Sequence, residues 1–250
     1  MEILPEKILM AIVDELPKKK SKKGRPEECR LKIIRGIFFI LKTGSQWVLL
    51  PNEYGKRSTV HGRFMEWCRS GAWNRAFEAI RERYDKIYPE INWYAIDTSS
   101  RKAPFAKDGG KNPTDRAKRG LKHVLVVDRK GVPVLANIAP ANRHDTKIFE
   151  PIIDRIGTQK RTLILAADSA FDVERFYKKC TEKNIALIAT PRNKRNQKVH
   201  KFRVVHRWII EQTFGILSWF RGLKTCWAKT TESALGFLHF ACLVRILRAI

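Results

Sequence analysis

Apolar residues recur at helical spacing in four stretches of the first third of the chain. The first stretch, residues 6–16, gathers its apolar side chains on one helical face: Ile8, Leu9, Ile12, Val13 and Leu16. The second covers residues 28–42 and ends before Gly44, a residue type that commonly closes a helix. After a turn at residues 51–55, Ser58 or Thr59 is expected to cap a third helix, and Gly71 separates it from a fourth. The pattern predicts an all-helical domain over residues 1–88.

The third predicted helix has a polar and basic outer face. Its apolar stripe runs through Val60, Phe64 and Trp67, and other positions around the helix are polar. Several short helices with a basic third helix suit a helix-turn-helix DNA-binding module. A plain helical bundle with a solvated face fits the same pattern equally well. In the first case, the DNA contacts are expected at Arg57, Ser58, Thr59, His61 and Arg63.

Near Pro89 the pattern changes from helical to extended, so we place a domain boundary within residues 85–91 and a second domain at residues 89–250. Short apolar strands are expected at WYAID, which ends in Asp97, at LILAAD, which ends in Asp168, and at IALIAT. Residues 122–127 and 132–138 predict a hairpin, and helices are expected at residues 146–156, 173–183 and 205–223. This order of elements predicts the α/β class, with a mixed sheet covered by helices.

Charge points to the kind of partner. The chain has 50 Lys and Arg against 25 Asp and Glu, a net charge of +25. Such a charge attracts polyanions, and nucleic acid is the commonest one, because neutralising phosphates releases counterions. A merely basic, solvated surface is the alternative explanation. Charge therefore favours a nucleic-acid-binding protein.

Cysteine spacing and hydropathy exclude some other classes. The five cysteines are far apart and include no C-x-x-C pair, so we expect reduced thiols and no structural zinc. The most apolar stretch, ALGFLHFACLVRILRAI, is interrupted by charged residues and is too short to span a bilayer. The N-terminus lacks the order of charged and apolar residues of a signal peptide. We therefore expect a cytoplasmic protein without a membrane partner.

Three acidic residues are candidates for chemistry. Asp97 and Asp168 each end a predicted strand, at the sheet edge where ligand sites gather in open α/β folds. Taken singly, an aspartate at such a position is more often a turn or cap residue. Glu211 lies in RWIIEQTFGILSWF, a helix apolar on most sides, so we expect it to be buried with a cation. That cation is either Arg207, one helical turn earlier, or a metal ion.

The chemistry of the three candidate side chains indicates which type of metal ion they could bind. Three carboxylates without His or Cys suit hard cations such as Mg²⁺ or Mn²⁺. Two such ions can activate the attacking oxygen and stabilise the leaving oxygen in a displacement at phosphorus. A basic protein that acts on DNA can use acidic residues in this way.

With these acids placed, the chain resembles the DDE transposases of bacterial insertion sequences, in the family named after insertion sequence five. The resemblance covers nearly the whole chain, and its motifs occur in the family's order. They are GRPEECRLKIIRGIFFILKTGSQWVLLP, YGKRSTVHGRFMEWCRSGAW, the AID that ends at Asp97, GKNPTDRAKRGLKHVLVVD, ANRHD, the AADSAFD around Asp168, the RWIIEQTFGILSWFRGL around Glu211, and FLHFACLVRIL.

The resemblance implies a ribonuclease-H-like catalytic domain after an N-terminal DNA-binding module. It also implies that Asp97, Asp168 and Glu211 hold two Mg²⁺ or Mn²⁺ ions, supported by Arg207. The reaction that it implies is cleavage at a transposon end, after which the freed 3′-hydroxyl attacks target DNA. The implied partners are double-stranded DNA, as terminal inverted repeats and as target, and further copies of the chain, at least a homodimer in the synaptic complex.

The chain departs from the family pattern at a few positions. Val204 and Ser218 replace a tyrosine before the arginine and a basic or amide residue after the glutamate. Ser218 has no charge with which to contact a phosphate, so that contact is either missing or supplied by Arg221 or Lys224. A catalytically impaired DNA-binding protein of transposase descent therefore remains the alternative to an active transposase. A nuclease that cuts without joining strands is a third possibility.

Other residues near the expected site have two explanations each. The Gly-rich loop carries basic residues that we expect to contact DNA phosphates: Lys111, Arg116, Lys118, Arg119 and Lys122. His144 and Asp145 are expected to be turn and cap residues. The tryptophans Trp208, Trp219 and Trp227 are expected in the core, although stacking on unpaired bases is an alternative.

Overall fold

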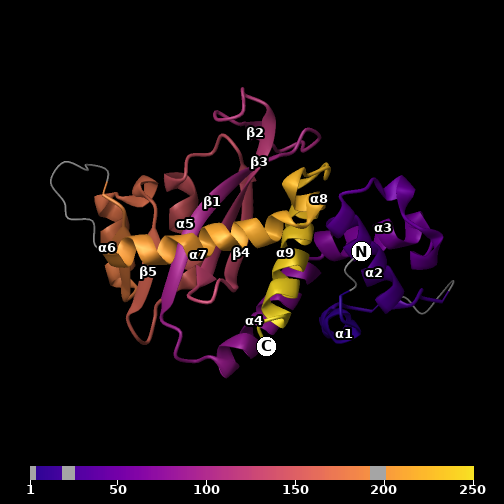
Figure 1. The fold of residues 1–250 in the computed structure, drawn as a ribbon, viewed down its shortest axis with the longest axis horizontal. Coiled ribbons are helices and arrows are strands. Elements are labelled where there is room, and N and C mark those ends of the chain that lie inside the picture. The colour runs from indigo at the N-terminus through magenta and orange to yellow at the C-terminus, as the bar shows by residue number, and fades with distance from the viewer. Residues whose placement is uncertain (1–3, 19–25, 192–200) are drawn as a thin grey trace.

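The computed structural model describes residues 4–18, 26–191 and 201–250, with the side chains of residues 201–207 left out of the description. A mixed sheet lies on one side, a group of helices from the N-terminal third lies on the other, and the C-terminal helix stands between them (Figure 1). The order of helices and strands predicted from the apolar pattern is confirmed.

The N-terminal part is helical throughout. Its helices are α1 (Glu6–Glu15), α2 (Arg30–Thr43), α3 (Arg57–Arg69) and α4 (Ala72–Ile87), with short 3-10 turns at Trp47–Leu49 and Asn52–Tyr54. Gly44 closes α2 with φ of 69°, as predicted. The expected cap of α3 is wrong: the helix begins at Arg57 after Lys56, and no side chain caps it. Ser58 and Thr59 instead lie exposed in its first turn.

The sheet combines an antiparallel half with a parallel half. Its strands are β1 (Trp93–Lys102), β2 (Gly110–Lys111), β3 (Arg119–Asp128), β4 (Pro133–Pro140), β5 (Leu163–Ala167) and β6 (Ile185–Ala189). β3 pairs antiparallel with β1, β4 and the short β2, whereas β5 is parallel to both β1 and β6. The long strands are ordered β4-β3-β1-β5-β6. The mixed sheet predicted from the order of elements is confirmed, and this strand order agrees with the ribonuclease-H-like domain that the family resemblance implies.

The remaining helices cover the two faces of this sheet. α5 (Thr146–Ile156) and α6 (Glu174–Glu182) pack on one face, and α7 (Lys201–Ser218) crosses the other face over β1, β3 and β5 (Figure 1). The predicted single helix over residues 205–223 is wrong in its last part. The chain turns at Trp219 and Phe220 and resumes as α8 (Arg221–Lys224), because Phe220 points into the core.

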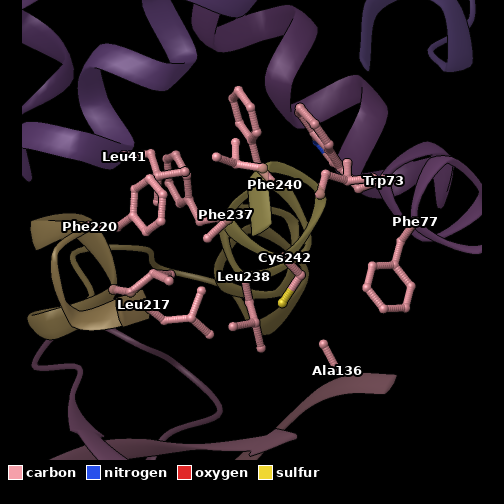
Figure 2. Packing of buried hydrophobic residues seen from close by; sticks show 14 of the residues in the cluster. Leu41, Trp73, Phe77, Ala136, Leu217, Phe220, Phe237, Leu238, Phe240 and Cys242 are labelled. Atoms are coloured by element: carbon pink, nitrogen blue, oxygen red, sulfur yellow. The ribbon is translucent and has the colours of Figure 1, made fainter. Parts of the chain in front are cut away.

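The C-terminal helix α9 (Thr231–Leu247) joins the two parts of the molecule. It packs on α3 and α4 on one side and on β4 on the other, and its residues are buried nearly all round. Figure 2 shows it seen along its axis, with Phe240 toward Trp73 of the N-terminal helices and Leu238 and Cys242 on other sides. One hydrophobic core therefore continues across residues 85–91, and the division into domains 1–88 and 89–250 stays a prediction. None of the described helices is both long and apolar enough to cross a membrane.

Candidate active site

Asp97 and Asp168 lie at the same level on neighbouring strands. The parallel pairing of β1 and β5 ends at Ala95 opposite Ala166, and each aspartate follows two residues later. Asp168 directly follows the last residue of β5, as predicted. The expectation that Asp97 ends its strand is wrong, because β1 continues to Lys102 by pairing with β3. Asp97 thus lies where β1 extends past the end of its parallel neighbour.

Both aspartates lie on the sheet face that α7 covers. Side chains alternate between faces along a strand, so Asp97 shares a face with Trp93 and Ala95, and Asp168 shares one with Ile164 and Ala166. These four apolar residues all pack in the core that contains the inner side of α7, whereas Ile96 and Leu165 pack in the core under α5 and α6. The two carboxylates therefore lie on one face, toward α7.

Glu211 lies on the flank of α7 that is turned toward the end of β1. Phe214, three residues later on the same flank, is buried, and the Arg101 guanidinium lies 6.0 Å from its ring centroid. Arg101 shares its strand face with Asp97. The fold thus brings the three predicted acids to one face of the sheet from three separate elements.

The carboxylates differ in their surroundings. Asp97 Oδ1 accepts a hydrogen bond of 2.7 Å from the Thr98 amide, and Asp168 Oδ1 accepts one of 2.6 Å from the Ser169 amide. Both aspartates are half-buried, whereas Glu211 is exposed, so the expectation of a buried glutamate is wrong. Among the residues of α7 whose side chains the structure describes, the buried side carries Ile209, Ile210 and Leu217. The side chains of Arg207 and Val204 lie outside the described residues.

The residues at this face fit a hard cation in chemistry. Three carboxylates from β1, the end of β5 and α7 supply the oxygen donors that Mg²⁺ and Mn²⁺ prefer. In the part of the chain that the structure describes, no three His, Cys, Asp or Glu side chains are already gathered as a metal-binding cluster. The use of these three acids together as metal ligands therefore stays a prediction.

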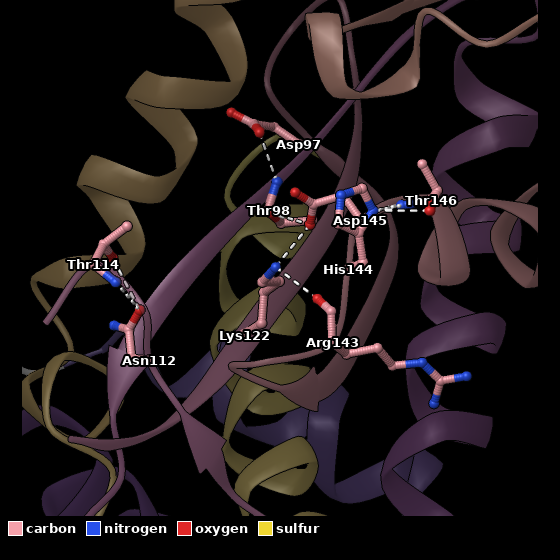
Figure 3. A network of polar contacts seen from close by, with 9 residues as sticks. All are labelled: Asp97, Thr98, Asn112, Thr114, Lys122, Arg143, His144, Asp145 and Thr146. Carbon is pink, nitrogen blue, oxygen red and sulfur yellow. Dashed lines mark hydrogen bonds and ion pairs between the residues drawn. The ribbon is translucent and has the colours of Figure 1, made fainter. Parts of the chain in front are cut away.

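A polar network holds the segment around Asp97 from the other face of the sheet (Figure 3). Thr98 Oγ1 donates to Asp145 Oδ1 at 3.0 Å, and Lys122 Nζ donates to the same oxygen at 2.9 Å and to the Arg143 carbonyl at 2.9 Å. Lys122 is buried, with 9% of its surface exposed. Its ammonium group binds Asp145 and the Arg143 carbonyl within the protein and does not face solvent, so the predicted contact between Lys122 and DNA is wrong. The role of Asp145 as an anchor for this segment was not visible in the sequence.

The predicted DNA contacts of α3 fall into two groups. Arg57, Ser58, Thr59 and His61 are exposed near the start of the helix. Burial, and then the positive charges of Arg57 and Arg69, lower the pKa of His61. Arg63 forms ion pairs with Glu27 and Glu66 and is largely buried, so its guanidinium is engaged within the protein.

The predicted basic loop projects beyond the sheet. Lys111, Arg116 and Lys118 are exposed there, and Arg116 and Ala117 have φ values of 48° and 57° in a tight turn. Arg119 donates to the carbonyls of Ala106 and Lys107, which fixes the base of the loop. Arg221 and Lys224 are exposed on α8. These side chains are available to solvent, and their contact with DNA stays a prediction.

The three tryptophans are not in the core. Trp208 is 52% exposed, Trp219 is 76% exposed and Trp227 is 50% exposed, so the expectation of core packing is wrong. Trp208 lies on the outward side of α7, opposite the residues that pack on the sheet, and Trp219 directly follows the last residue of that helix. A helix that is apolar on most sides does not reveal from its sequence which side is covered.

Comparison with known proteins identifies the family. Residues 89–247 match the family model described as "Transposase DDE domain", and residues 9–77 match one described as "Putative transposase of IS4/5 family". A Burkholderia cepacia protein named "Putative transposase for insertion sequence element IS402" is 29% identical over 176 residues, 67% of this chain and 80% of that protein. An "Insertion element IS402 uncharacterized 16.2 kDa protein" of the same organism is 33% identical over 92 residues, 35% of this chain and 61% of that protein.

Solved structures give weaker similarity. The catalytic core domain of BIV integrase matches with a TM-score of 0.34 and 14% identity, over 59% of this chain and 82% of that chain. The Mos1 strand transfer complex matches with a TM-score of 0.30 and 11% identity, over 92% of this chain and 81% of that chain. Family membership rests on the sequence matches.

Proposed function

This chain belongs to the family of transposases with a DDE domain, and from that premise we propose that it cuts DNA at insertion-sequence ends and joins the freed strand to target DNA. The supporting observation is the placement of Asp97, Asp168 and Glu211 on one face of the sheet, from three elements distant in sequence. Each of these acids lies in a sequence motif that resembles the family, and all three lie on the same face of the sheet.

We assign Asp97, Asp168 and Glu211 as the ligands of the divalent cations, with Arg207 in support. When bound, two such ions polarise the scissile phosphate and stabilise charge on the attacking and leaving oxygens. The carboxylates orient the ions, and the hydrogen bonds from the Thr98 and Ser169 amides hold one oxygen of each aspartate in place. Asp145 and Lys122 keep the β1 segment rigid behind Asp97.

The reaction has two steps at phosphorus. In the first, water attacks a phosphodiester at the end of the element, so a P–O bond to water forms, the P–O3′ bond breaks, and the 3′-oxygen leaves as a 3′-hydroxyl. In the second, this hydroxyl attacks a phosphodiester of target DNA, so its oxygen bonds to phosphorus while the 3′-oxygen of the target strand leaves and takes up the proton. The substrates are double-stranded DNA with terminal inverted repeats and target DNA, brought together by at least two copies of the chain.

Exposed basic and polar side chains outside the three acids would hold the DNA. We assign phosphate contacts to the exposed residues of α3, the projecting loop and α8: Arg57, Ser58, Thr59, His61, Lys111, Arg116, Lys118, Arg119, Arg221 and Lys224. Such contacts position the duplex without reading its sequence. The net charge of +25 supports this binding and predicts a steep dependence on salt.

A DNA-binding protein that has lost cleavage is the second candidate. Ser218 donates its hydroxyl to the Phe214 carbonyl at 2.7 Å, so it is used within α7 and does not replace a basic phosphate contact. A cleavage assay with DNA from the ends of the resident element, with and without Mg²⁺ or Mn²⁺, separates the candidates. Metal-dependent nicks with 3′-hydroxyl ends and joined products support a transposase. Nicks without joining indicate a nuclease, and binding without nicks indicates the regulator.

A further inference from the structure

A cavity of about 810 Å³ lies between the N-terminal helices and the C-terminal part of the chain. Its walls come from the end of α2 with the residues that follow it, from α3, from the β1–β2 connection, and from the segment that runs from α8 into the start of α9. The Lys107 amide donates to the Lys229 carbonyl at 3.0 Å, which ties the last two together. The three acids lie outside this lining, so the cavity is distinct from the catalytic face.

Aromatic rings form much of the lining of this cavity. On one side, the rings pack against each other in the core. Trp47 packs against Phe64 and Phe237, with ring centroids 5.6 Å and 6.1 Å apart. Phe105 and Trp227 pair with each other at 5.6 Å on the other side, and they are 57% and 50% exposed. Burying these two rings would be favourable, yet the fold presents them to solvent at the rim. Exposed aromatic rings at the rim can stack on a planar ligand.

The rim of the cavity is positive. Lys107 and Lys229 line it, and none of the residues described as lining it is acidic. Arg57 and Arg69 lower the pKa of His61, another lining residue, after the larger effect of burial. The cavity therefore combines aromatic walls with a field that attracts anions. Grooves that bind single-stranded nucleic acids combine the same two features, because bases stack on rings while phosphates contact cations.

We propose that this cavity takes an unpaired nucleobase of the bound DNA, stacked on Phe105 and Trp227, with the adjoining phosphates against Lys107 and Lys229. Bases inside a duplex are stacked on one another and cannot enter, so the occupant comes from a frayed or single-stranded segment. The side-chain amide of Gln46 lies in the lining and can bond the edge of the base. This inference rests on the proposed function only in that DNA is bound.

Binding of fluorescent oligonucleotides to the full chain in EDTA tests the proposal without any catalytic step. Three probes of equal charge are compared by anisotropy: a single strand, the same strand with abasic residues, and a duplex of matched phosphate number. The wild-type chain should bind the single strand about tenfold more tightly than the abasic strand. Equal affinity for these two probes would overturn the proposal, because it would show that only phosphates are recognised.

Variants locate the base within the molecule. Trp227→Ala and Phe105→Ala should each weaken single-strand binding by about fivefold or more and leave duplex binding within about twofold. Trp208→Ala, which removes an equally exposed ring from α7, should change neither. Thermal melting checks that the variants fold, and Trp227→Phe, which keeps an aromatic ring, should restore most of the affinity. A loss with Trp208→Ala as large as that with Trp227→Ala would also overturn the proposal.

These results are separable from the proposed function. If duplex binding and metal-dependent cleavage are retained while the single strand shows no preference over the abasic strand, only the role of the cavity fails. If the chain binds neither duplex nor single strand, the proposed function fails as well. Preference for an acidic aromatic peptide over every oligonucleotide would assign the cavity to a protein partner and overturn the proposal.

Discussion

Asp97 and Asp168 each lie two residues beyond a hydrogen-bonded pair of parallel strands, Ala95 of β1 and Ala166 of β5. Neighbouring strands are about 4.8 Å apart, so this shared register places two carboxylates side by side on the face toward α7. Two carboxylates at such positions can share a divalent cation, which offsets the repulsion between their like charges. The register therefore supports the proposed divalent metal site.

Removing one of these carboxylates should separate binding from cleavage. Asp168→Asn deletes a proposed metal ligand and a negative charge near phosphates, so DNA affinity should stay equal or increase while the cleavage rate falls at least about 100-fold. Gel-based cleavage and anisotropy binding assays measure the two effects. Asp154→Asn, the same change in an exposed residue paired with Lys179, should alter neither. Cleavage by Asp168→Asn at the wild-type rate would refute its assignment.

The network behind Asp97 should contribute to stability. Lys122→Met leaves Asp145 without its buried cation and should lower the free energy of unfolding by about 1–3 kcal/mol. Urea unfolding measures this, and the loss in the double variant with Asp145→Asn should be smaller than the sum of the single losses. Lys179→Met breaks an ion pair of similar length on the surface and should cost much less. Additive losses at Lys122 and Asp145 would show that the two are not coupled.

Buried histidines should make the fold sensitive to mild acid. Burial lowers the pKa of His239 to about 4 and that of His123 to about 3. As pH falls through 6.5, the unfolded chain takes up protons that the folded protein does not bind, so the free energy of unfolding decreases; well above pH 6.5 the two histidines have no effect. Each should cost about 2 kcal/mol between about pH 7.5 and pH 5.

A histidine variant checks this pH dependence. His239 stacks on Phe77 with ring centroids 5.3 Å apart, so His239→Phe removes the titrating group and keeps an aromatic ring. Urea unfolding at several pH values should show that the free energy of unfolding decreases less steeply with falling pH in this variant than in the wild-type chain. His144→Gln, at an exposed histidine, should leave the slope unchanged. An unaltered slope in His239→Phe would contradict the buried neutral state.

Two glycines test the core that joins the N-terminal helices to α9. A Cβ at Gly236 would lie 2.6 Å from Cys68 Sγ and 3.1 Å from Trp73 Cδ1, so Gly236→Ala should lower the free energy of unfolding by about 1–3 kcal/mol. Gly215 on α7 has open space around it, and Gly215→Ala should raise that free energy by up to about 1 kcal/mol. Chemical unfolding of both variants is the measurement. A neutral Gly236→Ala would show that α9 packs loosely on α3 and α4.

Much of the fold could be predicted from the sequence because apolar periodicity reports the buried side of each element. The hairpin of β3 and β4 and the strands that precede Asp97 and Asp168 were found in this way. The second half of β1 was missed because residues 98–102 are polar, yet backbone hydrogen bonds to β3 hold them regardless of side chain. The two-residue strand β2 carries no pattern at all.

The candidate site was predicted in its residues but not in its surroundings. The acids could be named because each interrupts or ends an apolar segment. The exposure of Glu211 and Trp208 could not be foreseen, because α7 has apolar residues on both its inner and outer sides. The pairing of Lys122 with Asp145 depends on the approach of β3 to the segment before α5, a contact that spans 23 residues.

The central claim is that Asp97, Asp168 and Glu211 together hold divalent metal. A crystal structure of the chain bound to DNA and soaked in Mn²⁺, with data collected for anomalous scattering, tests it most directly. The account predicts an anomalous peak within about 2.0–2.3 Å of carboxylate oxygens of Asp97 and Asp168, with Glu211 beside it. Ordered DNA at this face with no manganese between the three acids would contradict the account.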